Sequence, residues 1–139
     1  MGSKLTESQR RALQVLIDTF MPALGDEDAK AVLADPDLEA SAWSATRTAA
    51  AKRVLGTSGS ELGVSGAMEE LLGKGVLQRE EDVSLRLVLE LLSSAAGTAL
   101  LCTANPLKGA FTHRSPLDRE ALLLRLSTRC VRTLSLLPV

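Results

Sequence analysis

Side chains that could carry out chemistry are few in this chain, and they are scattered. His113 is the only histidine among 139 residues, and it lies in the connection between two predicted helices. Neither a second histidine nor a closely spaced cysteine pair accompanies it, as a zinc site would require. We therefore expect His113 to face the solvent and to take no part in catalysis or zinc binding.

Cys102 and Cys130 are the two cysteines, and each lies near the end of a predicted helix without CxxC spacing. Two cysteines are too few to build a disulfide framework, so the sequence favours free thiols. A disulfide between the two is the alternative.

The acidic residues and the glycines also form no recognisable motif. Neighbouring carboxylates at positions 69–70 and 80–82 would point in different directions on a helix, which is typical of a solvated surface and of a helix start. The glycines between residues 56 and 66 do not match the GxGxxG pattern, and residues 73–75 lack the Walker spacing. The sequence thus predicts no active site, and function must be sought in the elements themselves.

Composition predicts an all-α protein with a single helical domain over residues 1–139. Hydrophobic residues make up 45% of the chain, aromatic residues make up only 2%, and there is no tyrosine. The core must then be aliphatic, which suits helices better than sheets because sheets favour β-branched and aromatic residues. We expect a bundle of about five helices.

Charge and hydropathy limit the partners and the location of the protein. The net charge of −1 gives little counterion release on DNA or RNA, so no nucleic-acid partner is expected. Charged residues among the first eleven positions argue against a signal peptide, which favours an intracellular protein. The uncharged stretch 91–107 is shorter than the roughly 20 apolar residues of a membrane span. We expect a buried core helix there, and peripheral membrane contact stays open.

Local start and stop signals place the first helix at about residues 7–21. Thr6 and Gln9 have the spacing of a capping box, in which each residue binds the backbone N–H of the other. Pro22 follows the apolar positions and ends the helix.

Asp35 followed by Pro36 predicts a second helix over residues 35–55, because proline at the first helical position costs nothing. Trp43, the only tryptophan, is expected to pack across a helix junction rather than to bind a ligand. A flexible Gly/Ser-rich connection at about 56–66 and a short helix at about 65–72 follow.

The last two helices are long and leucine-rich, and the segment 105–109 (NPLKG) separates them. The first, at about residues 80–103, is apolar almost all the way round, which is typical of a central helix. Gly97 lowers its helix propensity, and we expect this glycine to allow another backbone to approach closely.

The final helix begins with Ser115 as its cap and Pro116 at its first position. We expect six of its residues to point toward the core, namely Leu117, Ala121, Leu124, Cys130, Val131 and Leu134.

Apolar residues of the last two helices form the candidate surface for packing or docking. The members of this surface are Leu92, Gly97, Leu100, Leu101, Leu117 and Leu124. Because the chain lacks recognisable catalytic residues, we expect it to bind a neighbour instead of catalysing a reaction. A free-standing helical interaction or accessory module without redox activity is one interpretation.

Three groups of residues, in order along the chain, carry a family resemblance. Residues 5–13 and 17–24 (LTESQRRAL and IDTFMPAL) contain an apolar-Pro-x-Leu element at the end of a helix. Residues 87–94 and 97–102 (LVLELLSS and GTALLC) combine a leucine-rich helix with Gly-Thr-x-Leu-Leu-Cys. Phe111 and residues 115–123 (SPLDREALL) complete the set. Together they resemble the N-terminal helical region of long-chain fatty alcohol oxidases, flavoenzymes of the glucose-methanol-choline oxidoreductase group.

The resemblance implies an enzyme that uses FAD to convert long-chain primary alcohols to aldehydes, with oxygen as the acceptor. The flavin domain of that family is absent from these 139 residues, so no catalytic or cofactor-binding residue can be assigned to this chain. A flavin domain, in the same or a separate chain, is the implied partner, and contact with a membrane or a lipidic substrate is implied as well. The layout is also similar to the small helical subunit of flavin-dependent gluconate dehydrogenases, which favours an accessory role.

Overall fold

The computed structural model describes the backbone of residues 4–135 and the side chains of residues 4–127. Seven α-helices follow one another: α1 (Glu7–Phe20), α2 (Asp26–Leu33), α3 (Ala45–Leu55), α4 (Val64–Gly73), α5 (Arg79–Leu92), α6 (Ala95–Cys102) and α7 (Pro116–Ser135). Four short 3-10 helices lie between them: η1 (Pro36–Leu38), η2 (Ala40–Ala42), η3 (Pro106–Lys108) and η4 (Phe111–His113). The described residues contain no strand, so the all-α class is confirmed, whereas the expected number of about five helices is too low.

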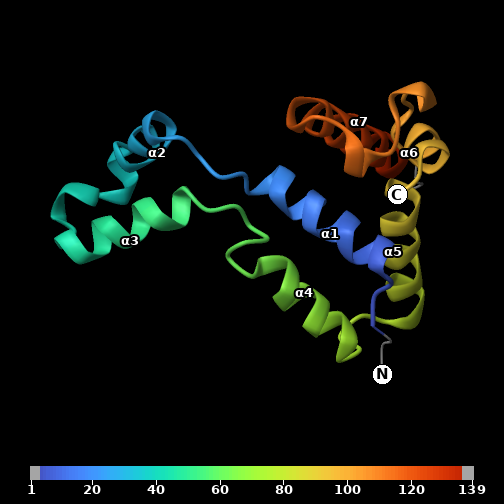
Figure 1. Cartoon of the computed structure of the whole chain (residues 1–139), viewed down its shortest axis with the longest axis horizontal. Coiled ribbons are helices and arrows are strands. Elements are labelled where there is room, and N and C mark those ends of the chain that lie inside the picture. The colour runs from blue at the N-terminus through green and yellow to red at the C-terminus, as the bar shows by residue number, and fades with distance from the viewer. Residues whose placement is uncertain (1–3, 136–139) are drawn as a thin grey trace.

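Helix α1 is the central element of the fold. The predicted capping box is present, because Gln9 N donates to Thr6 Oγ1 at 3.2 Å and Thr6 N donates to Gln9 Oε1 at 3.0 Å. The helix contacts α4, α5, α7 and η4 (Figure 1). Its buried face includes Ala12 and Leu13, so the sequence prediction for this helix is confirmed.

The core lies where α1, α5, α6 and α7 meet. Its largest fully buried side chains are Leu89, Leu92, Thr98, Cys102 and Phe111. The hydroxyl of Thr98 is satisfied inside this core, since it accepts a hydrogen bond from Phe111 N at 2.9 Å and donates to Leu92 O at 3.3 Å. The other buried members of this core cluster are aliphatic residues and Cys102, as the low aromatic content leads one to expect.

The single helix expected over residues 80–103 is wrong, because two helices, α5 and α6, replace it. Ser94 starts the second of them, as its hydroxyl accepts a hydrogen bond from Gly97 N at 2.9 Å. The close approach predicted at Gly97 is present: a Cβ on this residue would overlap the carbonyl oxygen of Leu91. Among the described residues, no single helix has the length and composition to cross a membrane. Helices α5 and α6 together have the length and composition of a span, by those two criteria alone, but they are bent by 115° relative to each other.

The helix expected over residues 35–55 is also wrong in extent. Asp35 does cap a turn that begins at Pro36, but only the short helix η1 follows. Glu39 then adopts a left-handed conformation with φ of 51°, which ends the helical path, and Ser44 starts α3 with a new cap. Helix α2 lies between the first two predicted helices, in a segment for which the sequence analysis predicted no helix.

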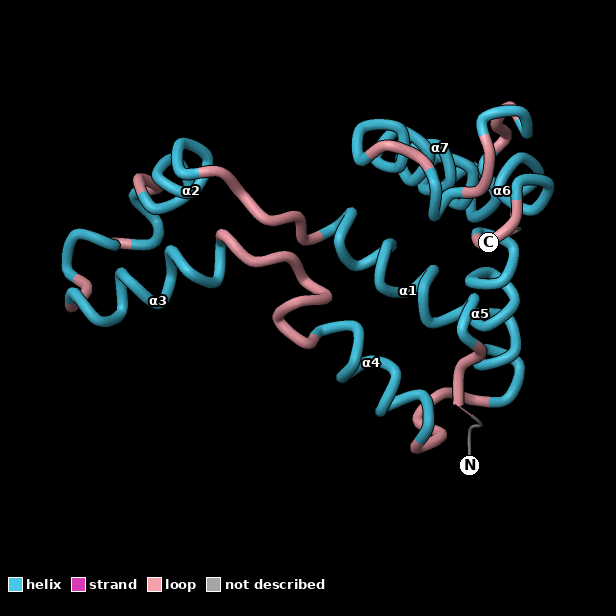
Figure 2. The backbone as a smooth tube through the Cα atoms, in the orientation of Figure 1, coloured by secondary structure: helices cyan, strands magenta, loops and turns pink. Residues whose placement is uncertain are grey.

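Helices α2 and α3 form a hairpin that projects from the rest of the molecule (Figures 1 and 2). We call residues 24–56 the arm. Of the side chains described in α2 and α3, only Ala29 is buried. Two backbone hydrogen bonds hold the base of the arm, from Leu24 N to Leu55 O at 2.9 Å and from Gly59 N to Met21 O at 2.8 Å.

The connection at 56–63 is irregular, and it is anchored to α1. Ser60 donates to Asp18 twice, from its backbone N at 2.8 Å and from its hydroxyl at 2.7 Å. Gly59 lies against Ile17, where an added Cβ would come within 2.5 Å of a methyl carbon. The arm is therefore attached at its base, while most of its own surface is exposed.

Candidate functional site

The described residues hold no group of three or more histidine, cysteine or acidic side chains that could bind a metal ion. His113 is exposed in η4, in agreement with the sequence prediction. Cys102 is buried in the core, and the side chain of Cys130 lies outside the described residues, so free thiols stay a prediction.

The acidic clusters take part in ion pairs that stabilise helices. Glu69 of α4 receives hydrogen bonds from Arg10 of α1, with Nη2 2.8 Å and Nε 3.0 Å from Oε1. These hydrogen bonds lower the pKa of Glu69 below its ordinary value. Asp82, in the first turn of α5, accepts from Arg86 Nε at 2.8 Å. Both carboxylates therefore have partners within the fold, as structural ion pairs do.

The predicted packing or docking residues fall into two groups in the structure. Leu92 and Gly97 are buried between α5 and α6, and Leu101 is half-buried against the core. Leu100, Leu117 and Leu124 are exposed, by 78%, 77% and 70% respectively. Only this second group is accessible to a partner.

The prediction that Leu117, Ala121 and Leu124 point toward the core is wrong, and the side chains of the other predicted residues, Cys130, Val131 and Leu134, lie outside the described residues. Leu122, 3% exposed, and the half-buried Leu123 face the body instead. Successive helical residues are 100° apart, so a helix with leucine at 122, 123 and 124 cannot bury all three against one neighbour.

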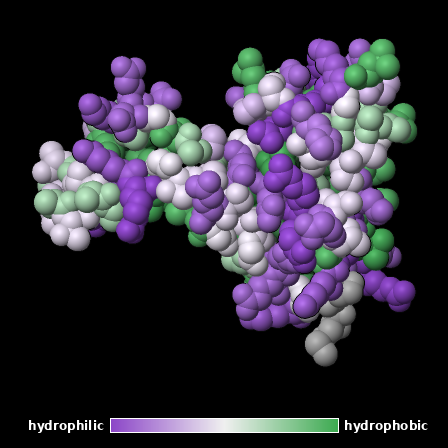
Figure 3. Space-filling model, in the orientation of Figure 1, coloured by the Kyte–Doolittle hydropathy of each residue, from purple (hydrophilic) through white to green (hydrophobic). Residues whose placement is uncertain are grey.

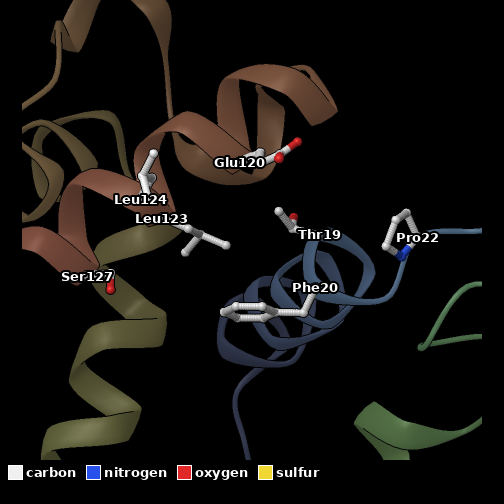
Figure 4. Close-up of a pocket in the computed structure, with 7 residues that line it drawn as sticks. All are labelled: Thr19, Phe20, Pro22, Glu120, Leu123, Leu124 and Ser127. Atoms are coloured by element: carbon white, nitrogen blue, oxygen red, sulfur yellow. The ribbon is translucent and has the colours of Figure 1, made fainter. Parts of the chain in front are cut away.

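A cleft of about 550 Å³ lies between the C-terminal end of α1 and the middle of α7 (Figure 4). Its lining residues are Thr19, Phe20, Pro22, Glu120, Leu123, Leu124 and Ser127. Leu123 reaches from α7 toward Thr19 and Phe20 of α1. One carboxylate and two hydroxyls among apolar groups provide no acid–base pair, so the cleft has the character of a contact surface. No local sequence pattern predicts this cleft, because its walls are about a hundred positions apart in the chain.

A second hollow of about 230 Å³ lies at the base of the arm. Its lining residues are Leu24, Asp26, Ala29, Lys30, Lys52 and Gly56. It is small, and three of its six lining residues, Asp26, Lys30 and Lys52, are charged and exposed.

The edge of the molecule formed by α5, α6 and η3 carries exposed aliphatic side chains, and we call it the α5–α6 edge. Val83 and Leu87 lie on α5, Leu100 on α6 and Leu107, which is 92% exposed, on η3. Figure 3 shows hydrophobic residues gathered along this side, while hydrophilic residues dominate the face over α1 and α4. Monomeric proteins expose few large apolar patches, so such an edge is typical of a binding surface.

The described side chains thus provide apolar surfaces and structural ion pairs, and neither resembles an active site. No protein-family model, curated protein or solved structure matches the chain.

Proposed function

We propose that this chain is the non-catalytic N-terminal helical portion of an FAD-dependent long-chain fatty alcohol oxidase. In this proposal it covers or supports a flavin domain, which belongs to the same or a separate chain and supplies the cofactor and the chemistry. The resemblance of residues 5–24, 87–102 and 111–123 to that family supports the proposal.

The exposed α5–α6 edge is the single observation that carries a docking function. Leu100 and Leu107 are among the most exposed large hydrophobic side chains of the described residues. Fully burying one leucine side chain stabilises a contact by about 1.5–3 kcal/mol relative to leaving it in water. A partner that covers this edge would bury these side chains, and that free energy would stabilise the complex. In the isolated chain the same side chains stay in water.

The test is binding between the purified 139-residue chain and the purified flavin domain of a long-chain alcohol oxidase that lacks its own helical region. We expect isothermal titration calorimetry to detect a complex. Replacing both Leu100 and Leu107 by Glu should weaken it by at least about a hundredfold, because two charges would be buried without partners. Val54→Glu in the arm is the matched control, since Val54 is an exposed aliphatic residue on a different element.

Two results would contradict the proposal. The first is the absence of binding by the wild-type chain while circular dichroism shows that it is folded. The second is a yellow preparation of the chain alone with flavin absorbance, because a chain that holds FAD by itself would not be a covering module.

A free-standing helical interaction module without redox activity is the second candidate, and the projecting arm favours it. The arm exposes Val32, Leu38 and Val54 and is held to the body only at its base. The titration separates the two candidates when the arm variant is included. If binding depends on the edge and not on the arm, the oxidase proposal is supported. If the flavin domain does not bind, the module is the better description.

A further inference from the structure

We propose that two copies of this chain associate through α7 in an antiparallel, two-fold symmetric arrangement. The contact is made by Leu117, Ala121 and Leu124, which we call the α7 stripe. This inference concerns a different face from the α5–α6 edge, so it stands or falls independently of the proposed oxidase role.

The α7 stripe has the geometry of a helix-pairing surface. Its members are spaced at i, i+4 and i+7, which places them on one side of the helix, opposite to the buried Leu122. Leu117 and Leu124 are 77% and 70% exposed, and Ala121 is exposed between them. A small residue between two leucines lets a second helix approach closely, as at the seam of a coiled coil. Helix α7 lies at an outer edge of the molecule in Figure 1.

Charged residues beside the α7 stripe favour a second copy of this chain as the partner, and they favour an antiparallel orientation of its α7. Asp118 and Arg125 follow the two leucines by one position each, so they lie on the same flank of the helix. An antiparallel second copy places Leu117 across from Leu124 of that copy, and Asp118 across from its Arg125. Two-fold symmetry repeats this ion pair, so the surface is complementary to itself.

The opposite direction uses these charges less completely. In a parallel pair each flank meets the other flank of the second copy, which would place Glu120 near Arg125 but leave Asp118 without a basic partner on α7. Among the described residues, neither Asp118 nor Glu120 has an ion-pair partner within 4.0 Å. Antiparallel helices also align their dipoles favourably, with acidic residues of one copy near the basic end of the other.

The size of the stripe sets the expected affinity. Stable interfaces bury about 800 Å² on each partner, and three side chains on one helix fall short of that area. We therefore expect a weak, reversible dimer with a dissociation constant of about 10–100 µM.

Sedimentation velocity of the full chain over a concentration series, up to about ten times that dissociation constant, tests the proposal. The wild-type chain should shift from monomer to dimer. Leu124→Glu should abolish the shift within the same range, because it would bury a charge at each end of the interface. Leu107→Glu is the matched control: Leu107 is an even more exposed leucine on η3, and this variant should dimerise like the wild type.

Charge exchange tests the direction of the pair. Asp118→Arg and Arg125→Asp, each alone, should raise the dissociation constant about tenfold, since each creates two like-charge contacts. The double variant should restore the wild-type value, because it only inverts each ion pair. Circular dichroism of every variant confirms that the helices are intact.

Three outcomes would overturn the proposal. A strictly monomeric wild-type chain at the highest concentration excludes the dimer. If Leu107→Glu disrupts the dimer and Leu124→Glu leaves it intact, the interface lies on another face. A double charge variant that stays as weak as the single variants excludes the antiparallel arrangement.

Discussion

Glu69 illustrates how the chemistry of a single residue is absorbed by the fold. Its carboxylate joins α4 to α1 through Arg10, and the hydrogen bonds from Arg10 lower the pKa of Glu69 from its ordinary value of 4.5. A carboxylate with a lowered pKa in the folded state stabilises the fold above its ordinary pKa. That contribution is lost as the pH falls through the lowered value.

The Glu69→Gln variant should therefore melt about 2–4 °C below the wild type near pH 7, as expected for a partly exposed ion pair. The difference should shrink as the pH falls below the ordinary pKa of 4.5, because the wild-type carboxylate becomes protonated too. Thermal melts followed by circular dichroism at several pH values measure it. Glu61→Gln, at an exposed glutamate without a salt bridge, should show no such trend.

Gly97 is the residue at which backbone geometry leaves no room for a side chain. A Cβ at this position would overlap Leu91 O, and it would come within 2.6 Å of Ser94 Oγ. We expect Gly97→Ala to lower the free energy of unfolding by about 1–3 kcal/mol in urea titrations, because the bend between α5 and α6 must open. Gly66→Ala is the control: Gly66 lies inside α4 with nothing within 4 Å of an added Cβ, so alanine should stabilise by about 0.5–1 kcal/mol. Equal effects of the two substitutions would contradict this account.

At the scale of elements, the arm is the part that the rest of the fold constrains least. Its base depends on Asp18, whose carboxylate accepts two hydrogen bonds from Ser60. Two charge-assisted bonds of this kind contribute about 1–3 kcal/mol to holding the connection on α1.

Asp18→Ala should loosen the arm while leaving the core folded. We expect trypsin to cleave after Lys52 or Arg53 about tenfold faster, since local opening becomes easier by about 1.4 kcal/mol or more. Limited proteolysis followed by mass spectrometry identifies the cuts. Asp37→Ala removes a carboxylate from η1, within the arm but away from its base, and should leave the cleavage rate unchanged. Faster cleavage in both variants would mean that the hydrogen bonds to Ser60 are not the restraint.

At the scale of the whole molecule, Phe111 joins elements that lie far apart in the sequence. It is fully buried, η4 contacts α1, and its backbone N–H binds Thr98 of α6. We expect Phe111→Ala to lower the free energy of unfolding by about 3–5 kcal/mol, because a large cavity would replace the ring. Leu107→Ala, at a side chain 92% exposed, should change it by less than about 0.5 kcal/mol.

Trp43 offers a second readout for these unfolding experiments. It lies in the arm, where the guanidinium of Arg47 is 4.5 Å from the centre of its ring. Its fluorescence therefore reports on the arm, whereas circular dichroism reports on all helices. If the fluorescence and circular dichroism transitions coincide, the arm and the body unfold together. If the two transitions are separate, the arm melts on its own.

The sequence alone determined the features that depend on neighbours three or four positions away. The capping box at Thr6, the start of the last helix at Ser115 and the all-α class are confirmed. Such features are local, because a cap satisfies backbone groups within its own first turn whatever the tertiary surroundings.

Only the tertiary structure decided which surfaces are buried and which stay available. The break at Ser94 depends on α6 folding back against α5, since the same serine would be tolerated inside a straight helix. The direction of Leu117 and Leu124 depends on which side of a leucine-rich helix meets α1 and α6, and the spacing along α7 allows either. The cleft between α1 and α7 requires two helices about a hundred residues apart to converge. Local propensity cannot encode these choices, because the burial of apolar area that decides them is a sum over the whole folded chain.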